Sequence, residues 1–207
     1  MNISVLGCGR WGSFHAWYAQ RVGHVVTLWG RAGSAHLAQL RGTRTNEFLT
    51  LPEDIHLTDD LAEAVRAAEG VIISIHAQAL RSFLRDLCSR GLGAELAKRR
   101  IILCMKGLEI STGKRLSTVV HEELGSAVYP VVWVGPGHVQ DFVRGIPNCM
   151  VLAGLRKPAV SSGSTRGTWG AAAVPAARTI GAPQGKRSMR RRQVSAGTLP
   201  AIVRSWM

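Results

Sequence analysis

Three glycines near the start of the sequence, Gly7, Gly9 and Gly12, have the spacing G-x-G-x-x-G. The apolar run Asn2–Leu6 directly precedes them, and a segment with helical periodicity, Ser13–Val22, follows. In this context the first glycine permits a tight turn, the second lets the backbone approach a pyrophosphate, and the third allows close packing of helix on strand. The helix N-terminus would offer unpaired N–H groups to the phosphates. The motif therefore predicts a dinucleotide site, with a purely structural turn as the alternative.

A basic side chain follows the second apolar run, His24–Trp29, after one further glycine. Sites that prefer NAD usually place Asp or Glu here to bind the ribose 2′-hydroxyl. Arg31 cannot accept that hydrogen bond, but its guanidinium can pair with a 2′-phosphate. The residue therefore favours NADPH over NADH, and a solvated surface arginine is the alternative.

A second candidate cation, Lys106, directly follows the apolar run Arg100–Met105. Open α/β folds bind ligands at the carboxyl ends of their strands. A lysine at that position offers positive charge to a phosphorylated substrate or to a developing alkoxide. A lysine that merely flanks a strand is the alternative. His76 and His138 also lie near strand ends, but we expect structural or surface roles for both.

Apolar strands alternate with helices along the first three quarters of the chain. This alternation predicts an α/β fold with a Rossmann-like, mostly parallel sheet and helices on both faces. The expected strands are 2–6, 24–29, 70–75, 100–105, 131–134 and 149–153, and the expected helices are 13–22, 61–68, 80–88 and 113–124.

The formal net charge of +13 is unevenly distributed. Residues 156–207 hold 10 Lys and Arg and no acid, and they are rich in Gly, Ser and Pro. Such a segment buries too little apolar surface to offset its ordering cost, so we expect two parts: a folded domain at 1–155 and a disordered basic tail at 156–207. The four cysteines show no metal-ligand spacing, and no signal peptide or membrane span is evident, which favours a cytoplasmic protein without a metal site.

Several segments in unbroken order resemble the bacterial type of NAD(P)-dependent glycerol-3-phosphate dehydrogenase. They are GCGRWGSFHA, VTLWGR, RTNEFLTLPEDIHLTDDLAEAV, CMKGLEISTGKRLSTVVHEELG and VGPGHVQDFVRGIPNCMVLAG, which together cover about residues 1–155. The resemblance implies an oxidoreductase that interconverts sn-glycerol 3-phosphate and dihydroxyacetone phosphate with NADPH or NADH, for phospholipid synthesis. The resemblance is compatible with a homo-oligomer, and it implies no membrane partner.

The resemblance implies roles for particular residues. Arg10, Trp11, Arg31, Lys106 and Val139 match positions that contact the cofactor. The positions that contact the substrate are matched by Lys106, Gly135 and Gly137. The family usually has Ser or Thr at the position of Gly137, so one hydroxyl contact to the substrate is expected to be missing.

The family's general base, a lysine followed by asparagine, lies in a second, helical domain. No lysine of this sequence is followed by asparagine, so no catalytic residue is identified. We interpret residues 156–207 as the product of a shifted reading frame, which predicts a truncated enzyme that binds cofactor only. The alternatives are a non-catalytic NADPH-binding module and nucleic-acid binding through the tail, which has a basic cluster at 186–192. Nucleic-acid binding is the less favoured of these because no aromatic residue lies within the cluster for base stacking.

Overall fold

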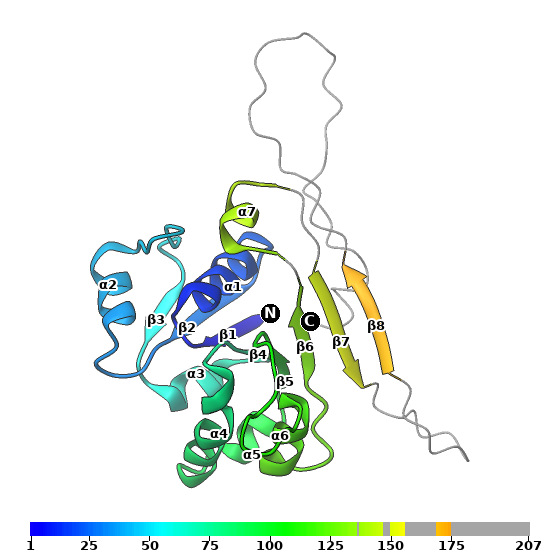
Figure 1. The fold of residues 1–207 in the computed structure, drawn as a ribbon. Helices are drawn as coiled ribbons and strands as arrows, with labels where there is room; N and C mark the ends of the chain where they lie inside the picture. Colours follow the sequence, from blue (N-terminus) through cyan, green and yellow to red (C-terminus); the bar gives the residue numbers. More distant parts are fainter. Residues whose placement is uncertain (136, 147–149, 156–168, 175–207) are drawn as a thin grey trace.

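The computed structural model describes residues 1–135, 137–146, 150–155 and 169–174. Eight strands form one sheet in the order β3-β2-β1-β4-β5-β6-β7-β8 (Figure 1). The strands are β1 Asn2–Leu6, β2 Val25–Trp29, β3 His56–Thr58, β4 Gly70–Ile73, β5 Arg100–Leu103, β6 Val131–Val134, β7 Met150–Leu155 and β8 Trp169–Val174. The helices are α1 Arg10–Arg21, α2 Ala35–Thr43, α3 Leu61–Ala67, the 3-10 turn η1 Ala77–Ala79, α4 Leu80–Ser89, α5 Gly93–Ala97, α6 Leu116–Leu124 and α7 Val139–Val143.

The six strands from β1 to β6 are mutually parallel, and β7 and β8 are antiparallel additions beside β6. The order 3-2-1-4-5-6 is that of dinucleotide-binding sheets, in which the chain crosses from one side of β1 to the other between β3 and β4. The carboxyl ends of neighbouring strands β1 and β4 therefore lie at the switch point of the sheet. This confirms the predicted Rossmann-like α/β fold.

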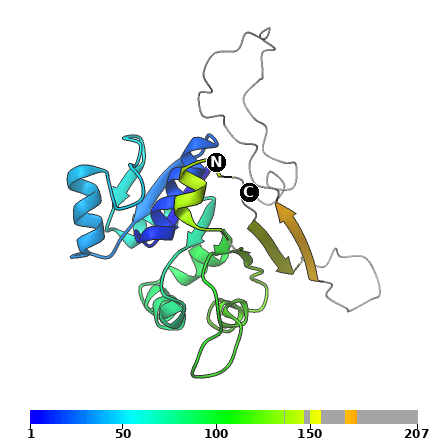
Figure 2. The same cartoon turned by 45° about the horizontal axis from the view of Figure 1, so that its top comes forward.

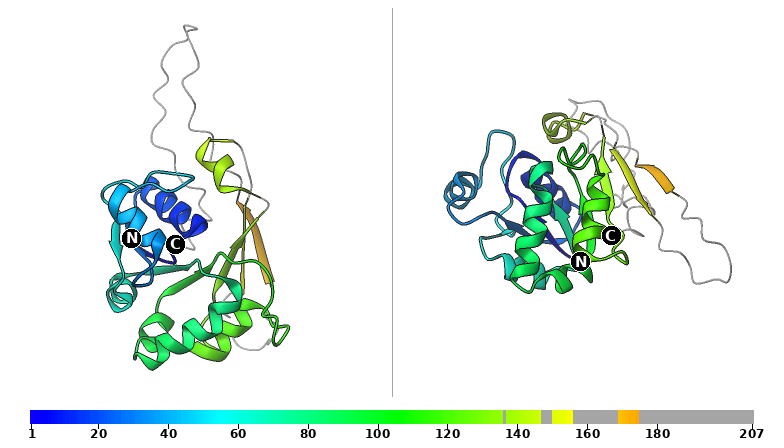
Figure 3. Two further views of the ribbon diagram at one scale, coloured as in Figure 1. Left: turned by 60° about the vertical axis from the view of Figure 1, so that its left-hand side comes forward. Right: turned by 60° about the horizontal axis from the view of Figure 1, so that its bottom comes forward.

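Two apolar cores cover the two faces of the sheet, because successive strand residues point to opposite faces. In β4, Ile72 belongs to the core beneath α1 and α2, whereas Val71 and Ile73 belong to the core beneath α3 to α6. The left view of Figure 3 shows the sheet between blue α1 on one side and the green helices on the other. Helix α4 supplies Leu80, Leu84 and Leu87 to its core, all fully buried.

The structure corrects one expectation about the tail. Residues 169–174 form β8, which pairs antiparallel with β7 from Met150↔Val174 to Leu155↔Trp169 (Figure 2), so this segment is not without structure. An edge strand such as β7 presents unpaired backbone N–H and C=O groups, and a short apolar run can pair with them whatever its side chains. The remaining residues of the 156–207 segment lie outside the described residues, so disorder there stays a prediction.

Two further findings concern sites rather than fold. Within the described part of the chain, none of the helices has the length and hydrophobicity of a membrane span. The same residues contain no grouping of three or more His, Cys, Asp or Glu side chains that could bind a metal ion.

Candidate functional site

The turn between β1 and α1 is held together by close contacts between backbone groups. Gly7 has a φ of +118°, and its N–H donates to the Trp29 carbonyl oxygen at 2.9 Å. A Cβ at Gly7 would lie 2.1 Å from the Ser74 carbonyl oxygen, and one at Gly12 would lie 1.6 Å from the Gly7 carbonyl oxygen. Gly7 is therefore required by the tight turn against the segment after β4, and Gly12 by the close packing of α1 on β1, the roles that the spacing predicts for the first and third glycines.

The middle glycine has a different environment. Gly9 is the N-cap of α1, and a Cβ built on it would meet nothing within 4 Å. No side chain caps this helix end, and its first turn contains no acidic residue. The first N–H groups of a helix have no intrahelical partner and carry partial positive charge. The open space at Gly9 and the uncapped end of α1 therefore fit the pyrophosphate of a dinucleotide.

Arg31 lies beside this turn, after β2, and is exposed. Burial raises the pKa of the neighbouring Cys8 thiol, and the hydrogen bond with Ser34 and the charge of Arg31 oppose that shift. The Cys8 sulfur lies 3.7 Å from the Ser34 oxygen. Ser34 also caps α2, where its oxygen accepts from the Leu37 N–H at 3.4 Å. Arg31 thus stands in the turn between β2 and α2, within electrostatic reach of the glycine turn.

Arg10 and Trp11 occupy the first turn of α1. The guanidinium of exposed Arg10 lies 4.1 Å from the centre of the Phe48 ring, in a cation–π contact. Half-buried Trp11 stacks on His15, with ring centres 5.7 Å apart. The motif predicts the place of Arg10 but not Phe48, which reaches this helix end only because its loop folds back. The one sequence signal for that fold is Asn46, whose side chain accepts from the Phe48 N–H at 2.9 Å as turn-forming Asn residues do.

Lys106 is exposed just beyond β5, at the same edge of the sheet as the glycine turn. No hydrogen bond or ion pair involves Lys106 among the residues that the structure describes. Strands β1 and β5 are separated only by β4, so two strand spacings, about 10 Å, separate their ends. The parallel sheet therefore places Lys106 within reach of a ligand that lies across its carboxyl edge.

The third group of predicted residues follows β6. Gly135 is half-buried directly beyond the strand, and Gly137 is buried. Val139 begins α7 and is only 1% exposed, because it packs in the core that also contains Phe14 of α1. A cofactor contact by Val139 would therefore require the residues that cover it to move. The structure brings Gly135 and Gly137 to the edge that carries Lys106, but not the Val139 side chain.

The two histidines that lie near strand ends are exposed and stand at the N-cap positions of short helices. His76 precedes η1 and His138 precedes α7, and neither side chain makes a capping hydrogen bond. No general acid–base partner is positioned for either among the residues that the structure describes. Their placement agrees with the expected surface roles.

The three predicted site cations differ from Arg81 in their charge pairing. Arg81 of α4 pairs with Glu109, Glu122 and Glu123 at 2.6–2.8 Å. Arg10, Arg31 and Lys106 have no carboxylate partner within the described ranges. Three unneutralised cations around an uncapped helix N-terminus fit an anionic ligand with several phosphates.

Comparisons with known proteins agree with this geometry. Residues 2–159 match the family model described as NAD-dependent glycerol-3-phosphate dehydrogenase N-terminus. Glycerol-3-phosphate dehydrogenase [NAD(P)+] of Thermoanaerobacter sp. (strain X514) is 39% identical over 160 residues, which are 75% of this chain and 46% of that protein. The Rhodopseudomonas palustris (strain HaA2) protein of the same name is 38% identical over 154 residues, 73% of this chain and 45% of its own length.

Among solved structures, glycerol-3-phosphate dehydrogenase from Coxiella burnetii matches with a TM-score of 0.61 and 26% identity over 71% of this chain and 44% of that one. The chain thus spans a little under half the length of the relatives that it matches. The matched residues contain the glycine turn, Arg31, Lys106 and the whole parallel sheet. This chain therefore belongs to the NAD-dependent glycerol-3-phosphate dehydrogenase family, whose N-terminal part it matches.

Proposed function

We propose that residues 1–155 bind NADPH across the carboxyl edge of the parallel sheet and serve the interconversion of sn-glycerol 3-phosphate and dihydroxyacetone phosphate. The observation that carries the proposal is the open space at Gly9 in front of the uncapped N-terminus of α1. A backbone that leaves this space open, with unpaired N–H groups behind it, suits a pyrophosphate. The names of the relatives support the substrate and the reaction.

The residues around the turn would bind the two ends of the cofactor. Arg31 would pair with the 2′-phosphate at the adenosine end, since it stands after β2 without a carboxylate partner among the described residues. Arg10, held over the Phe48 ring, would add positive charge at the same end of α1. Trp11, which is half-buried in the first turn of α1, would contact the cofactor beside Arg10.

Lys106 and the glycines after β6 would face the substrate. The bound nicotinamide supplies the hydride for reduction of a ketone. Lys106 would stabilise negative charge on the substrate's phosphate or on the oxygen that becomes an alkoxide. Gly135 and Gly137 would let the backbone come close to the substrate, and Gly137 offers no hydroxyl for a hydrogen bond. Proton transfer is not assigned to a residue of this chain.

We also propose a cytoplasmic location. The thiols of Cys8, Cys88 and Cys104 are unpaired among the described residues, as is usual in a reducing compartment.

Titration of the purified chain with NADPH tests the proposal, with nicotinamide fluorescence as the readout. Gly9→Val should abolish binding and leave the far-UV circular dichroism unchanged, because the added side chain fills the space left for the pyrophosphate. Gly42→Val is the matched control, since a Cβ at Gly42 also meets nothing within 4 Å but lies in α2. Normal NADPH binding by the Gly9 variant would show that the turn is structural only.

A further inference from the structure

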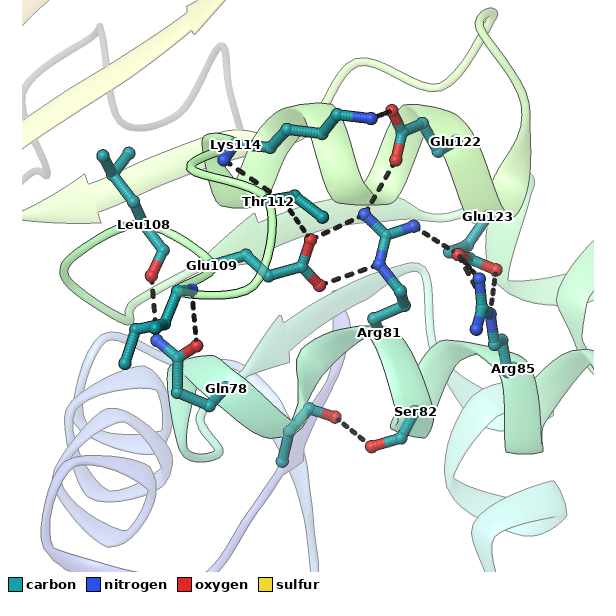
Figure 4. Close-up of polar contacts among 12 residues, drawn as sticks. Gln78, Arg81, Ser82, Arg85, Leu108, Glu109, Thr112, Lys114, Glu122 and Glu123 are labelled. Carbon is teal, nitrogen blue, oxygen red and sulfur yellow. Dashed lines mark hydrogen bonds and ion pairs between the residues drawn. The ribbon is translucent and has the colours of Figure 1, made fainter.

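A glutamine after β4 holds the backbone of the loop that carries Lys106. The Gln78 side chain donates through Nε2 to the Leu108 carbonyl oxygen at 2.8 Å and accepts at Oε1 from the Ile110 N–H at 2.8 Å. Both ends of one amide are thus used on two backbone groups that flank Glu109 (Figure 4). Gln78 lies in η1, so this contact joins the loop after β4 to the loop after β5.

The residue between those two backbone groups is held by a second side chain. The Arg81 guanidinium binds the Glu109 carboxylate in a two-point contact, Nε to Oε1 at 2.7 Å and Nη2 to Oε2 at 2.8 Å. Gln78 and Arg81 are three residues apart, a spacing that places side chains on one side of a helical segment. Three consecutive residues, 108 to 110, are therefore fixed by two side chains from one short stretch of chain.

This double contact decides which way the loop faces. Glu109 is 5% exposed, whereas Leu108 and Ile110 are 52% and 84% exposed, so the loop turns its charged residue inward and its apolar residues outward. Apolar side chains are not held outward by the hydrophobic effect, which favours the opposite arrangement. The hydrogen bonds of Gln78 and the ion pair of Arg81 therefore maintain this orientation together with the loop's own backbone bonds, which run from the Glu109 N–H to Lys114 and from the Gly113 N–H to Glu109.

Lys106 is separated from the held residues by a single glycine. Gly107 has a φ of +104°, a conformation that glycine adopts freely and other residues rarely adopt. On its other side Lys106 follows Met105, which is 7% exposed and part of the core. Lys106 thus lies in the chain between a buried residue, Met105, and the segment that Gln78 and Arg81 fix.

We propose that Gln78 and Arg81 are positioning residues for Lys106, which they hold at the cofactor-binding edge of the sheet without touching the ligand. The inference rests on the proposed function, in which Lys106 contacts the bound cofactor or substrate. Arg81 also binds Glu122 and Glu123 of α6 and so contributes to the fold in general. Gln78 is exposed, and its side chain bonds only the loop among the described residues, so Gln78 is the sharper test.

A double-mutant cycle on NADPH affinity provides the test. Gln78→Ala should raise the Kd for NADPH about three- to tenfold, the effect of two lost hydrogen bonds on the held geometry. In a Lys106→Met background the same change should alter the Kd less than about 1.5-fold, because its effect passes through Lys106. Gln20→Ala is the matched control and should leave the Kd unchanged in both backgrounds. Among the described residues the Gln20 side chain bonds only Asp54, at 2.8 Å, near the far end of α1.

The other outcomes are decisive as well. An equal loss of affinity in both backgrounds would overturn the proposal, as would a Gln78→Ala chain with wild-type affinity, although NADPH binding itself would then stand. Failure of the wild-type chain to bind NADPH would overturn the proposed function instead. In that case the hydrogen-exchange rate of the Ile110 amide tests the positioning role. A slow rate in the wild type that rises at least about tenfold in Gln78→Ala supports the role, and a fast rate in the wild type rejects it.

Discussion

Gly12 and Gly7 are in direct contact across the turn between α1 and β1: a Cβ on Gly12 would lie 1.6 Å from the Gly7 carbonyl oxygen. Only a displacement of α1 away from the sheet could accommodate a side chain there. The same helix end is the one that we propose binds phosphates, so the contact sets both the packing of α1 and the position of the site.

Gly12→Ala should lower the free energy of unfolding by about 1–3 kcal/mol, since the added methyl group has no space. Urea denaturation followed by circular dichroism measures the loss. Gly9→Ala provides the comparison, because a Cβ at Gly9 meets nothing within 4 Å, and its stability should stay within about 0.5 kcal/mol of the wild type. Equal losses in the two variants would contradict the assigned packing role.

Arg31→Glu should weaken NADPH binding about 10- to 100-fold, because a charge-assisted pair with the 2′-phosphate is replaced by repulsion. NADH lacks that phosphate, so its affinity should change much less. Parallel titrations with both cofactors give the two ratios. Arg90→Glu serves as the control, since Arg90 lies at the C-terminal end of α4, away from the carboxyl edge of the sheet. A similar loss for NADPH and NADH would mean that Arg31 does not read the 2′ position.

His15 should make the protein less stable as the pH falls. It is 1% exposed, and burial lowers its pKa to about 3 from an ordinary value of 6.5. Between these values the unfolded chain binds a proton that the folded chain does not. Stability should therefore fall by about 1.4 kcal/mol for each pH unit from pH 6 to pH 4 on account of this group.

His15→Phe should remove that part of the slope and keep the ring contact with Trp133, whose centre lies 4.6 Å away. Urea unfolding at several pH values measures the slope. His36→Phe, on the exposed surface of α2, should leave it unchanged. An unaltered slope in the His15 variant would refute the assignment.

Arg81→Met should make the protein unfold at a higher pH during acid titration. Arg81, followed by Thr112, holds the pKa of Glu109 at about 2, below the ordinary value of 4.5. The stabilisation from Glu109 is therefore complete above pH 4.5 and is lost as the pH falls toward 2. Without Arg81 the buried Glu109 carboxylate lacks its two-point partner, so it becomes protonated at a higher pH than in the wild type.

Circular dichroism during the acid titration locates the unfolding midpoint of each variant. Arg85→Met should shift the midpoint less, because Arg85 is exposed and pairs only with Glu123 among the described residues. A midpoint for Arg81→Met at or below that of the wild type would argue against the ion-pair network.

The chain of 207 residues should reduce dihydroxyacetone phosphate far more slowly than an enzyme of this family that has the expected general base. The resemblance places the general base at a lysine followed by asparagine, and this sequence contains no such pair. Acid–base assistance alone contributes about 10²–10⁴-fold to rate. An assay that follows NADPH absorbance measures the rate. Several turnovers per second would contradict the prediction, and the proton donor would then have to be sought at Lys106 and His138.

Much of the fold and part of the site could be predicted from the sequence because they depend on local patterns. Apolar runs of strand length, such as Gly70–Ile73, alternate with helical periodicity, as in α4, and that alternation predicts a parallel sheet. The spacing of Gly7, Gly9 and Gly12 identifies the turn, since Gly12 packs on Gly7 within the motif itself, whereas the contact of Gly7 with Ser74 appears only in the folded sheet. The short elements β3, α5 and α7 escape such prediction, because three to five residues carry too little periodicity.

Only the tertiary structure decided the contacts between residues far apart in the chain. Nothing in the sequence pairs Arg10 with Phe48, Gln78 with the backbone of residues 108–110, or Arg81 with three glutamates from two segments. The burial of Val139 and His15 likewise could not be predicted from the sequence, because it depends on which helix covers which part of the sheet. Local patterns report the conformational preferences of neighbouring residues, whereas these contacts exist only once the sheet order brings separate loops to one edge.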